Sequence, residues 1–194
     1  MASLPVFEKF ISNLRAIWDS ESDNERRMEK ARPLLETLVM DPGLKAHSAQ
    51  WPSTEGHKNL LLYVDPQRHF AVNAVVRTPG RTGGVHDHAD AWVLYGLLDG
   101  TESLERYERI DDESRPGYAE VRLASVTTGT QGKVDLVPPR AIHAEQGGPT
   151  RSVAVILRSQ RLGEGTILQR AYDPKAKTVS ERFGPTQVPY ELTV

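Results

Sequence analysis

The sequence predicts an all-β barrel or sandwich that carries an α-helical appendage at its N-terminus. In residues 1–45 the apolar side chains recur every three or four positions, which is the period of an amphipathic helix. From about residue 58 to residue 172 short apolar runs alternate with Gly, Pro and Asp, a series typical of antiparallel sheets. We expect one domain over 1–194, with the helical appendage at 1–45, the barrel at about 58–172 and a C-terminal tail at 173–194.

The N-terminal segment is expected to form two helices. The charged stretch 19–27 separates them, and Ser22 or Asp23 is placed to cap the second one. Pro33 marks a kink or a fresh helix start, and the "DPG" at 41–43 ends the second helix. The apolar face of the first helix consists of Val6, Phe7, Phe10, Ile11, Leu14, Ile17 and Trp18.

The strands are expected in the apolar runs that follow. In chain order these runs read NLLLYVD, FAVNAVVRTPG, AWVLYGLLDG, ESLERYERI, AEVRLASVTTG, KVDLVPP, SVAVILRS and TILQRAYD. The fourth run has a helix-like charge pattern, but its flanks are rich in turn residues, so we predict a strand there. The closing "FGPTQVPYELTV" contains two prolines and is expected to lie across the surface in an extended form.

Composition excludes several classes of function. With 24 basic and 26 acidic residues the net charge is −2, which gives no support to nucleic-acid binding. No run of about 18 apolar residues is present, so no membrane span is expected, and the N-terminus reads as a helix rather than a signal peptide. The absence of cysteine excludes disulfides, thiolate nucleophiles and Cys-ligated metals. We expect a cytoplasmic protein.

Three histidines suggest a metal site. His86 and His88 are two residues apart, and in a strand such residues project to the same face. Imidazole suits Fe, Zn, Cu and Ni. A third ligand must come from elsewhere in the fold, and His143, in a strand-like segment after a Pro-rich turn, is the candidate. His47, His57 and His69 fit no motif and are expected in the surface or core, although His57 is close enough to Lys58 to reach a pocket.

The two histidine segments resemble the two cupin motifs. Gly80, His86, His88 and Gly100 match the spacing of the first motif, and Gly132, Pro138 and His143 match the second. The resemblance implies a cupin jelly roll (double-stranded β-helix). Three positions depart from it: Val93 stands where the motif has its metal-binding glutamate, Arg140 stands for a glycine, and Gly147 stands for the final asparagine. A cupin without the glutamate resembles a three-histidine site, which leaves positions open for substrate and O₂.

Within the cupins, the chain resembles the cysteine dioxygenase family of thiol dioxygenases. The N-terminal helices, the "HDH" sequence, the missing glutamate and the "KNL" at 58–60 carry this resemblance. It implies Fe(II) bound by His86, His88 and His143, and O₂-dependent oxidation of a small thiol carboxylate to a sulfinate. In that family an arginine near the position of Lys58 holds the substrate carboxylate.

Other features of that family are absent from this sequence. The Ser-His-Tyr relay of the family falls on Ala154, Ile156 and Arg158, and none of the three matches. The crosslinking cysteine of some members falls on Val93, so no thioether cofactor can form. These losses weaken the case for cysteine as substrate and leave the metal ligands in place.

Four cationic side chains are candidates for binding a substrate carboxylate, because a guanidinium or ammonium pairs with that group. Arg158 is the first choice, since it interrupts the apolar strand "VAVIL", and Lys58 is the second. Arg77 and Arg140 are the remaining two.

Three further side chains are placed by parity along a regular strand. Tyr95 lies seven residues past His88 and is expected on the opposite face, in a structural role, whereas Trp92 shares the face of His88 and lines the pocket or the core. Glu145, two residues after His143, either orients a ligand, serves as a weak fourth ligand or lies solvated at the rim.

The function expected from these observations is a non-haem Fe(II) dioxygenase, with Zn, Ni and Cu not excluded as the metal. Its partners are a small-molecule substrate and O₂, without nucleic acid or membrane. One alternative is a three-histidine cupin dioxygenase that cleaves a carbon–carbon bond of a diketone, an aromatic or a hydroxyketone, favoured by the apolar Val93, Ala154 and Ile156. The other is a non-catalytic metal-binding cupin. A homodimer through Trp18 or the C-terminal tail is possible.

Overall fold

A computed structural model describes residues 4–161, 168–190 and 192. It begins with the helices α1 (Pro5–Ser20), α2 (Asn24–Val39) and α3 (Pro42–Ser48). The Asp23 side chain caps α2 by accepting a hydrogen bond from the backbone N–H of Arg26. No fresh helix begins at Pro33, because α2 runs through it. The loss of one backbone hydrogen bond there is tolerated in a helix whose apolar face is fully packed.

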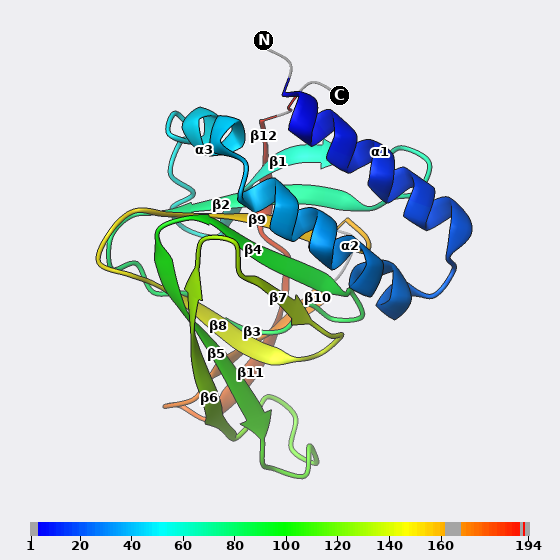
Figure 1. Cartoon of the computed structure of the whole chain (residues 1–194). Coiled ribbons are helices and arrows are strands. Elements are labelled where there is room, and N and C mark those ends of the chain that lie inside the picture. The colour runs from blue at the N-terminus through cyan, green and yellow to red at the C-terminus, as the bar shows by residue number, and fades with distance from the viewer. Residues whose placement is uncertain (1–3, 162–167, 191, 193–194) are drawn as a thin grey trace.

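Twelve strands within the described residues form two six-stranded sheets (Figure 1). The first has the order β12-β1-β2-β9-β4-β7 and the second the order β11-β10-β3-β8-β5-β6. The strands of the first sheet are β1 (Lys58–Val64), β2 (Ala71–Arg77), β4 (Val93–Asp99), β7 (Val134–Val137), β9 (Ser152–Arg158) and β12 (Thr186–Pro189). Those of the second are β3 (Val85–His86), β5 (Thr101–Arg109), β6 (Val121–Thr130), β8 (Ile142–Gly147), β10 (Leu168–Asp173) and β11 (Thr178–Phe183).

The strand order is that of a jelly roll, in which β2-β9-β4-β7 faces β3-β8-β5-β6. This confirms the predicted all-β jelly-roll barrel with an N-terminal helical appendage. The run at 102–110 is part of β5, as predicted. Figure 1 shows β5 and β6 extending together beyond the rest of the barrel. The strand expected at 166–173 is seen from Leu168 onward, and its first two residues lie outside the described residues.

The C-terminal segment 183–194 was expected to lie extended across the surface, and part of it is an extended strand that joins a sheet. β11 pairs with β10 as an antiparallel hairpin, and β12 adds to the edge of the first sheet by pairing parallel to β1. An edge strand tolerates prolines because one of its sides donates no ladder hydrogen bonds. The prolines at 185 and 189 therefore did not signal the strand they flank.

Both faces of the first sheet are buried, which explains the near-continuous apolar sequence of its strands. On β9, Val153, Val155 and Leu157 pack against the helices, whereas Ala154 and Ile156 face the barrel interior. Helices α1 and α2 cover the outer face of this sheet (Figure 1). Trp18 is 6% exposed in that layer, so its ring is not available for the dimer contact suggested by the sequence.

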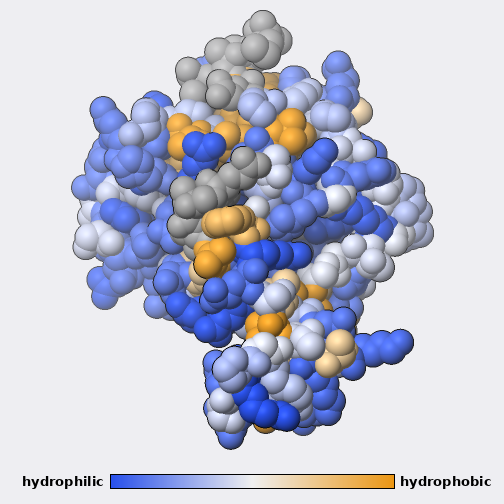
Figure 2. Space-filling view, turned by 180° about the vertical axis from the view of Figure 1, so that it is seen from behind, coloured by the Kyte–Doolittle hydropathy of each residue, from blue (hydrophilic) through white to orange (hydrophobic). Residues whose placement is uncertain are grey.

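The outer surface is predominantly polar. Figure 2 shows a largely hydrophilic face on which apolar residues gather in small, separate groups. Among the described residues, none of the helices combines the length and apolar character needed to cross a membrane.

Candidate metal centre

Three histidines meet between the two sheets. His86 ends β3, His88 follows two residues later, and His143 lies on β8, directly opposite His86 in the strand register. Their ring centroids are 4.4 to 4.8 Å apart, and one nitrogen from each ring lies within 4.8 Å of the others. In the part of the chain that the structure describes, no other group of His, Asp or Glu side chains is arranged to share a metal ion. The expected ligands are therefore brought together.

Two of the rings are oriented for metal binding by backbone carbonyls. The Nδ1 of His86 lies 2.9 Å from the oxygen of Gly84, and the Nδ1 of His143 lies 2.9 Å from the oxygen of Ala141. Because a carbonyl only accepts, each Nδ1 carries the proton and each Nε2 presents a lone pair. This is the usual arrangement of a ligand histidine.

The donor set fits a divalent cation. The Nε2 of His143 is buried without a hydrogen bond, and the nearest acceptor is Oε1 of Glu145, 3.3 Å away. A nitrogen lone pair that faces a carboxylate oxygen is unfavourable unless a cation lies close to both. Three imidazoles beside one carboxylate are suited to Fe, Zn, Ni or Cu.

His88 depends on Gln169, a residue that the sequence analysis did not single out. The Nε2 amide of Gln169 lies 2.6 Å from Nδ1 of His88, and Nη1 of Arg158 lies 3.4 Å from the same nitrogen. With two donors facing Nδ1, the proton of His88 belongs on Nε2. The same amide nitrogen donates to the backbone oxygen of Asp87 at 3.0 Å, and Oε1 of Gln169 is buried without a partner. Metal binding through Nε2 of His88 therefore requires this amide to turn, at the cost of its contact with Asp87, so that Oε1 accepts from Nδ1–H.

Burial keeps His86 and His88 neutral. It lowers the pKa of His86 to about 3, with a further contribution from the neighbouring His143. Burial, followed by the charge of Arg158, also holds the pKa of His88 well below its usual value. Both rings are therefore in the uncharged form that binds metals at neutral pH.

Arg158 lies next to the histidines and has only neutral partners. Its side chain is 2% exposed, its Nε donates to Oδ1 of Asn73 at 3.2 Å, and its Nη2 reaches the amide oxygen of Asn59 at 3.1 Å when that amide is correctly oriented. Among the described residues, no carboxylate lies within 4.0 Å of its guanidinium. Burial lowers the pKa of Arg158 to about 10, so it remains a cation at pH 7. A buried, unpaired cation is costly, and a bound anion would remove that cost.

Arg77, in contrast, is already neutralised. Its Nη1 donates to both carboxylate oxygens of Glu102 at 3.0 Å and to the hydroxyl of Tyr95, and its Nη2 lies 3.4 Å from Glu145. The hydroxyl of Ser152 donates to Glu102 at 2.6 Å and completes this buried network. Arg77 therefore holds Glu145 in place and has no free charge for a substrate.

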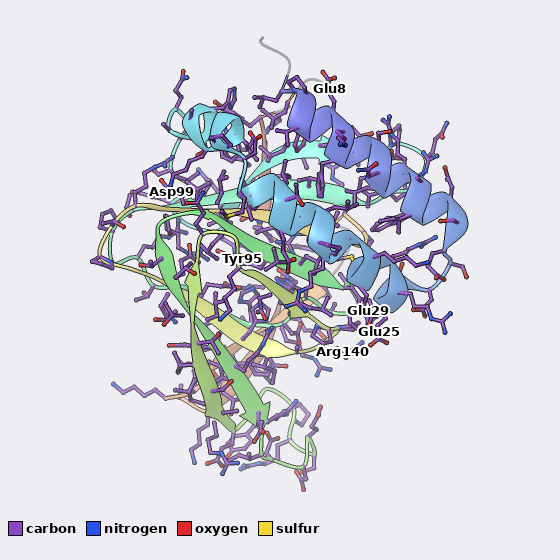
Figure 3. The ribbon with its side chains drawn as sticks, viewed as in Figure 1. Glu8, Glu25, Glu29, Tyr95, Asp99 and Arg140 are labelled. Carbon is purple, nitrogen blue, oxygen red and sulfur yellow. The ribbon has the colours of Figure 1, made fainter. Side chains whose placement is uncertain are left out.

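Tyr95 lies on the face opposite to the one expected, whereas Trp92 takes the second of its two expected places, the core. Tyr95 belongs to the barrel interior and borders the site (Figure 3), whereas Trp92 packs against the core between the helices and the first sheet. The parity argument assumed one strand through His88 and Tyr95. The chain instead leaves the second sheet after His86 and enters the first at Val93, so residue parity is not carried across.

Glu145 is buried and faces the histidines, so it is not a solvated rim residue. Although burial opposes its ionisation, the neighbouring His143, His86 and Arg77 lower the pKa of its carboxyl overall. Its carboxylate lies on the Nε2 side of His143, which is the metal side, and not on the Nδ1 side where an orienting partner would lie. Val93, at the position of the motif glutamate, is 1% exposed and stands opposite Arg158 in the register of β4 and β9.

His86, His88, Tyr95, Glu145 and Arg158 line one cavity of about 400 Å³. The buried Arg158 borders this cavity. Lys58, which is exposed at the start of β1, and the neighbouring His57 border it as well. Arg140 lies outside it, at the periphery in Figure 3, where its side chain pairs with Asp90 at 2.9 Å. Sequence analysis missed Arg81, Gln169 and Arg182, which also line the cavity. Gln169 lies on β10 and Arg182 lies on β11. β10 pairs with β3 and β11 pairs with β10, so long-range strand pairing brings both residues to the site.

The motif glycines occupy backbone conformations that favour glycine. Gly80, Gly100 and Gly132 have φ values of 71°, 74° and 85°. Arg140, which replaces another motif glycine, keeps the same left-handed conformation with a φ of 60°. The turns of the motifs are thus retained although this residue has changed.

No protein-family model matches the chain. The chain is similar to the cupin domain of Cnp3 from Schizosaccharomyces pombe, with 12% identity over 53% of this chain and 60% of that chain, at a TM-score of 0.40. It is similar to an uncharacterized double-stranded β-helix protein from Klebsiella pneumoniae, with 16% identity over 56% of this chain and 75% of that chain, at a TM-score of 0.38.

A third similar structure is an oxalate oxidase in complex with the substrate analogue glycolate, with 16% identity over 58% of this chain and 56% of that chain, at a TM-score of 0.44. Coverage of the similar structures themselves extends from 22% to 75% of their length. The jelly roll of this chain is established by its own strand order.

Proposed function

We propose that this protein is a non-haem iron dioxygenase that oxidises a small thiol carboxylate to a sulfinate. The observation that carries the proposal is the buried Arg158, which has no acidic partner among the described residues, beside three converging histidines, two of which line the same cavity as Arg158. The histidines would hold the metal, and when bound, ferrous iron supplies the chemistry by which O₂ reacts with a thiolate. Iron, and not another metal, is taken from the resemblance to the thiol dioxygenases.

The protein's own residues would bind and orient the substrate. Arg158 pairs with the carboxylate and fixes the distance between that group and the histidines. The cationic cavity favours the thiolate over the thiol, so the S–H proton leaves to solvent. The overall reaction is RS⁻ + O₂ → RSO₂⁻, in which two S–O bonds form and the O–O bond breaks. Sulfur loses four electrons and O₂ gains them.

A second candidate is oxidative cleavage of a carbon acid such as a β-diketone. It is favoured by the apolar part of the cavity wall, where Val75 and Ile156 lie. An apolar wall suits a larger and less polar substrate.

Oxygen uptake tests both candidates. Protein loaded with Fe(II) under anaerobic conditions is mixed with O₂ and a panel of cysteine, 3-mercaptopropionate, a neutral thiol, a β-diketone and a hydroxyketone. The thiol proposal predicts uptake with a thiol acid and one sulfinate formed for each O₂ consumed. Uptake with the carbon compounds alone would overturn it in favour of the second candidate, and iron-loaded protein without any uptake would overturn both.

The role of Arg158 is tested by Arg158→Gln, with Arg140→Gln as the control outside the cavity. Loss of a charge-assisted carboxylate contact should raise KM for a thiol acid by about 10- to 100-fold. KM for the neutral thiol should change less than about twofold, because that compound has no carboxylate to pair with the charge of Arg158. Equal increases for both thiols would contradict the role given to Arg158.

A further inference from the structure

The cavity contains a second unpaired cation on the wall opposite Arg158. Arg182 lies on β11 in the second sheet, whereas Arg158 lies on β9 in the first, and both border the same cavity of about 400 Å³. Arg182 is half-buried, and its Nε is shielded from solvent without a hydrogen-bond partner. Within the described residues, no acidic side chain lies within 4.0 Å of its guanidinium.

Strand pairing places Arg182 close to the histidines. Arg182 stands directly opposite Gln169 in the register of β10 and β11, and Gln169 contacts His88. At the end of β11, Nε2 of His57 lies 3.0 Å from the oxygen of Phe183, which joins this strand to the start of β1 and therefore to Lys58. Arg182 and Lys58 thus border the same side of the opening.

The charges that line the cavity do not balance. Five cationic side chains border it, and among the described residues Glu145 is the one carboxylate that does. Arg77 is bound to Glu102 and Glu145, and Arg81 donates to the backbone oxygens of Thr54 and Gly56.

Three cations therefore remain without acidic partners within the described part of the chain: Arg158, Arg182 and Lys58. A substrate with a single carboxylate would satisfy Arg158 and leave the charge of Arg182 uncompensated. The surplus is local, because the whole chain has a net charge of −2.

We infer that the substrate of this site carries two anionic groups, and that Arg182, assisted by Lys58, binds the second one. The inference rests on the proposed function for the site and specifies its substrate as a small thiol that carries two carboxylates. Arg158 binds the carboxylate next to the histidines, and Arg182 binds the distal one from the opposite sheet. Charge-assisted pairing at both ends fixes the orientation of the substrate as well as its affinity.

Succinate and butyrate provide a matched pair of probes, because they have the same number of carbons and differ by one carboxylate. Titration calorimetry of the purified full chain at pH 7 should give a Kd for succinate at least about 10-fold below that for butyrate. Arg182→Gln should raise the Kd of succinate by about 10-fold and leave that of butyrate within about twofold, whereas Arg158→Gln should weaken both. Arg122→Gln should change neither Kd, because Arg122 is an exposed residue of β6 that pairs with Glu108 away from the cavity.

Two controls keep the result interpretable. Arg182→Lys keeps the charge and should retain most of the preference for succinate, and circular dichroism checks that each variant is folded. Equal affinity for succinate and butyrate, or equal weakening of both by Arg182→Gln, would overturn the inference. Neither probe has a thiol or reacts with O₂, so the outcome is independent of dioxygenase activity.

Discussion

At the residue scale, the chemistry of the site depends on which nitrogen of each histidine is free. Backbone carbonyls fix the protons of His86 and His143 on Nδ1, and Glu145 lies 3.3 Å from the free Nε2 of His143. The sequence predicted these histidines from motif spacing. It did not predict the role of Gln169 or the side of His143 on which Glu145 lies, because both depend on rotamers and on pairing between distant strands.

Glu145→Gln should weaken metal binding by about 10-fold, because the variant keeps the size of the side chain and removes the negative charge beside the metal-facing nitrogen. Competition with a coloured chelator for Zn(II) or Fe(II) measures this affinity. Glu108→Gln, which changes an exposed glutamate on β5, is the control and should bind metal as the unmodified chain does. An unchanged affinity in Glu145→Gln would show that the carboxylate does not act on the metal.

Stability of the metal-free protein should fall as the pH drops below about 6.5. The pKa of His86 is about 3 in the folded chain and about 6.5 in the unfolded chain, so between these values the unfolded chain binds more protons. Each such histidine lowers the free energy of unfolding by up to about 1.4 kcal/mol per pH unit in that window.

Urea denaturation between pH 7 and pH 5 measures this slope. His86→Gln should make the slope shallower, and His47→Gln, at a histidine outside the cavity, should leave it unchanged. Identical slopes for both variants would contradict the neutral state of His86.

At the scale of elements, parity predicted side-chain directions only inside continuous strands. It placed Arg158 correctly with Ala154 and Ile156, because all three lie on β9. It failed between His88 and Tyr95, where the chain crosses from one sheet to the other. The crossing "DHADA" contains no Gly or Pro. Its turn is made by Ala89 at a φ of 49°, whose N–H donates to Oδ1 of Asp87 at 2.9 Å, and Asp alone is a weak turn signal.

Gly96→Val should destabilise the fold by about 1–3 kcal/mol, because it overfills the contact between β4 and α2. A Cβ at Gly96 would lie 3.1 Å from Cγ1 of Val39 and 3.2 Å from Cγ of Leu35. Chemical denaturation measures the change, and Gly84→Ala is the control because nothing lies within 4 Å of its added Cβ. Equal stability of Gly96→Val and the unmodified chain would show that α2 is free to move away from the sheet.

At the scale of the whole molecule, the cavity depends on both sheets. The second sheet and the turn after β3 contribute His86, His88 and Arg182, and the first sheet contributes Arg158 and Lys58. The helices bury the outer face of the first sheet and contribute no residue to the cavity lining in the described part of the chain. The class of the fold was predictable from strand-like runs and motif glycines, but the contribution of β10 and β11 to the site was not.

Metal binding should raise the thermal stability of the whole domain. A metal at 100 times its Kd adds about 2.7 kcal/mol to the free energy of unfolding, which corresponds to roughly 5–10 °C in Tm for a chain of this size. Differential scanning fluorimetry with Fe(II) under anaerobic conditions, before and after addition of a chelator, measures the shift. His86→Ala should show no shift, and a rise in that variant equal to the rise in the unmodified chain would place the binding elsewhere.

The central claim is that His86, His88 and His143 together form one metal centre. Its most direct test is the iron content of protein loaded with Fe(II) under anaerobic conditions and then desalted. The unmodified chain and His47→Ala should each retain one iron per chain, whereas His86→Ala, His88→Ala and His143→Ala should each retain less than about a tenth of that amount. Full iron retention by any of these three variants would contradict the account.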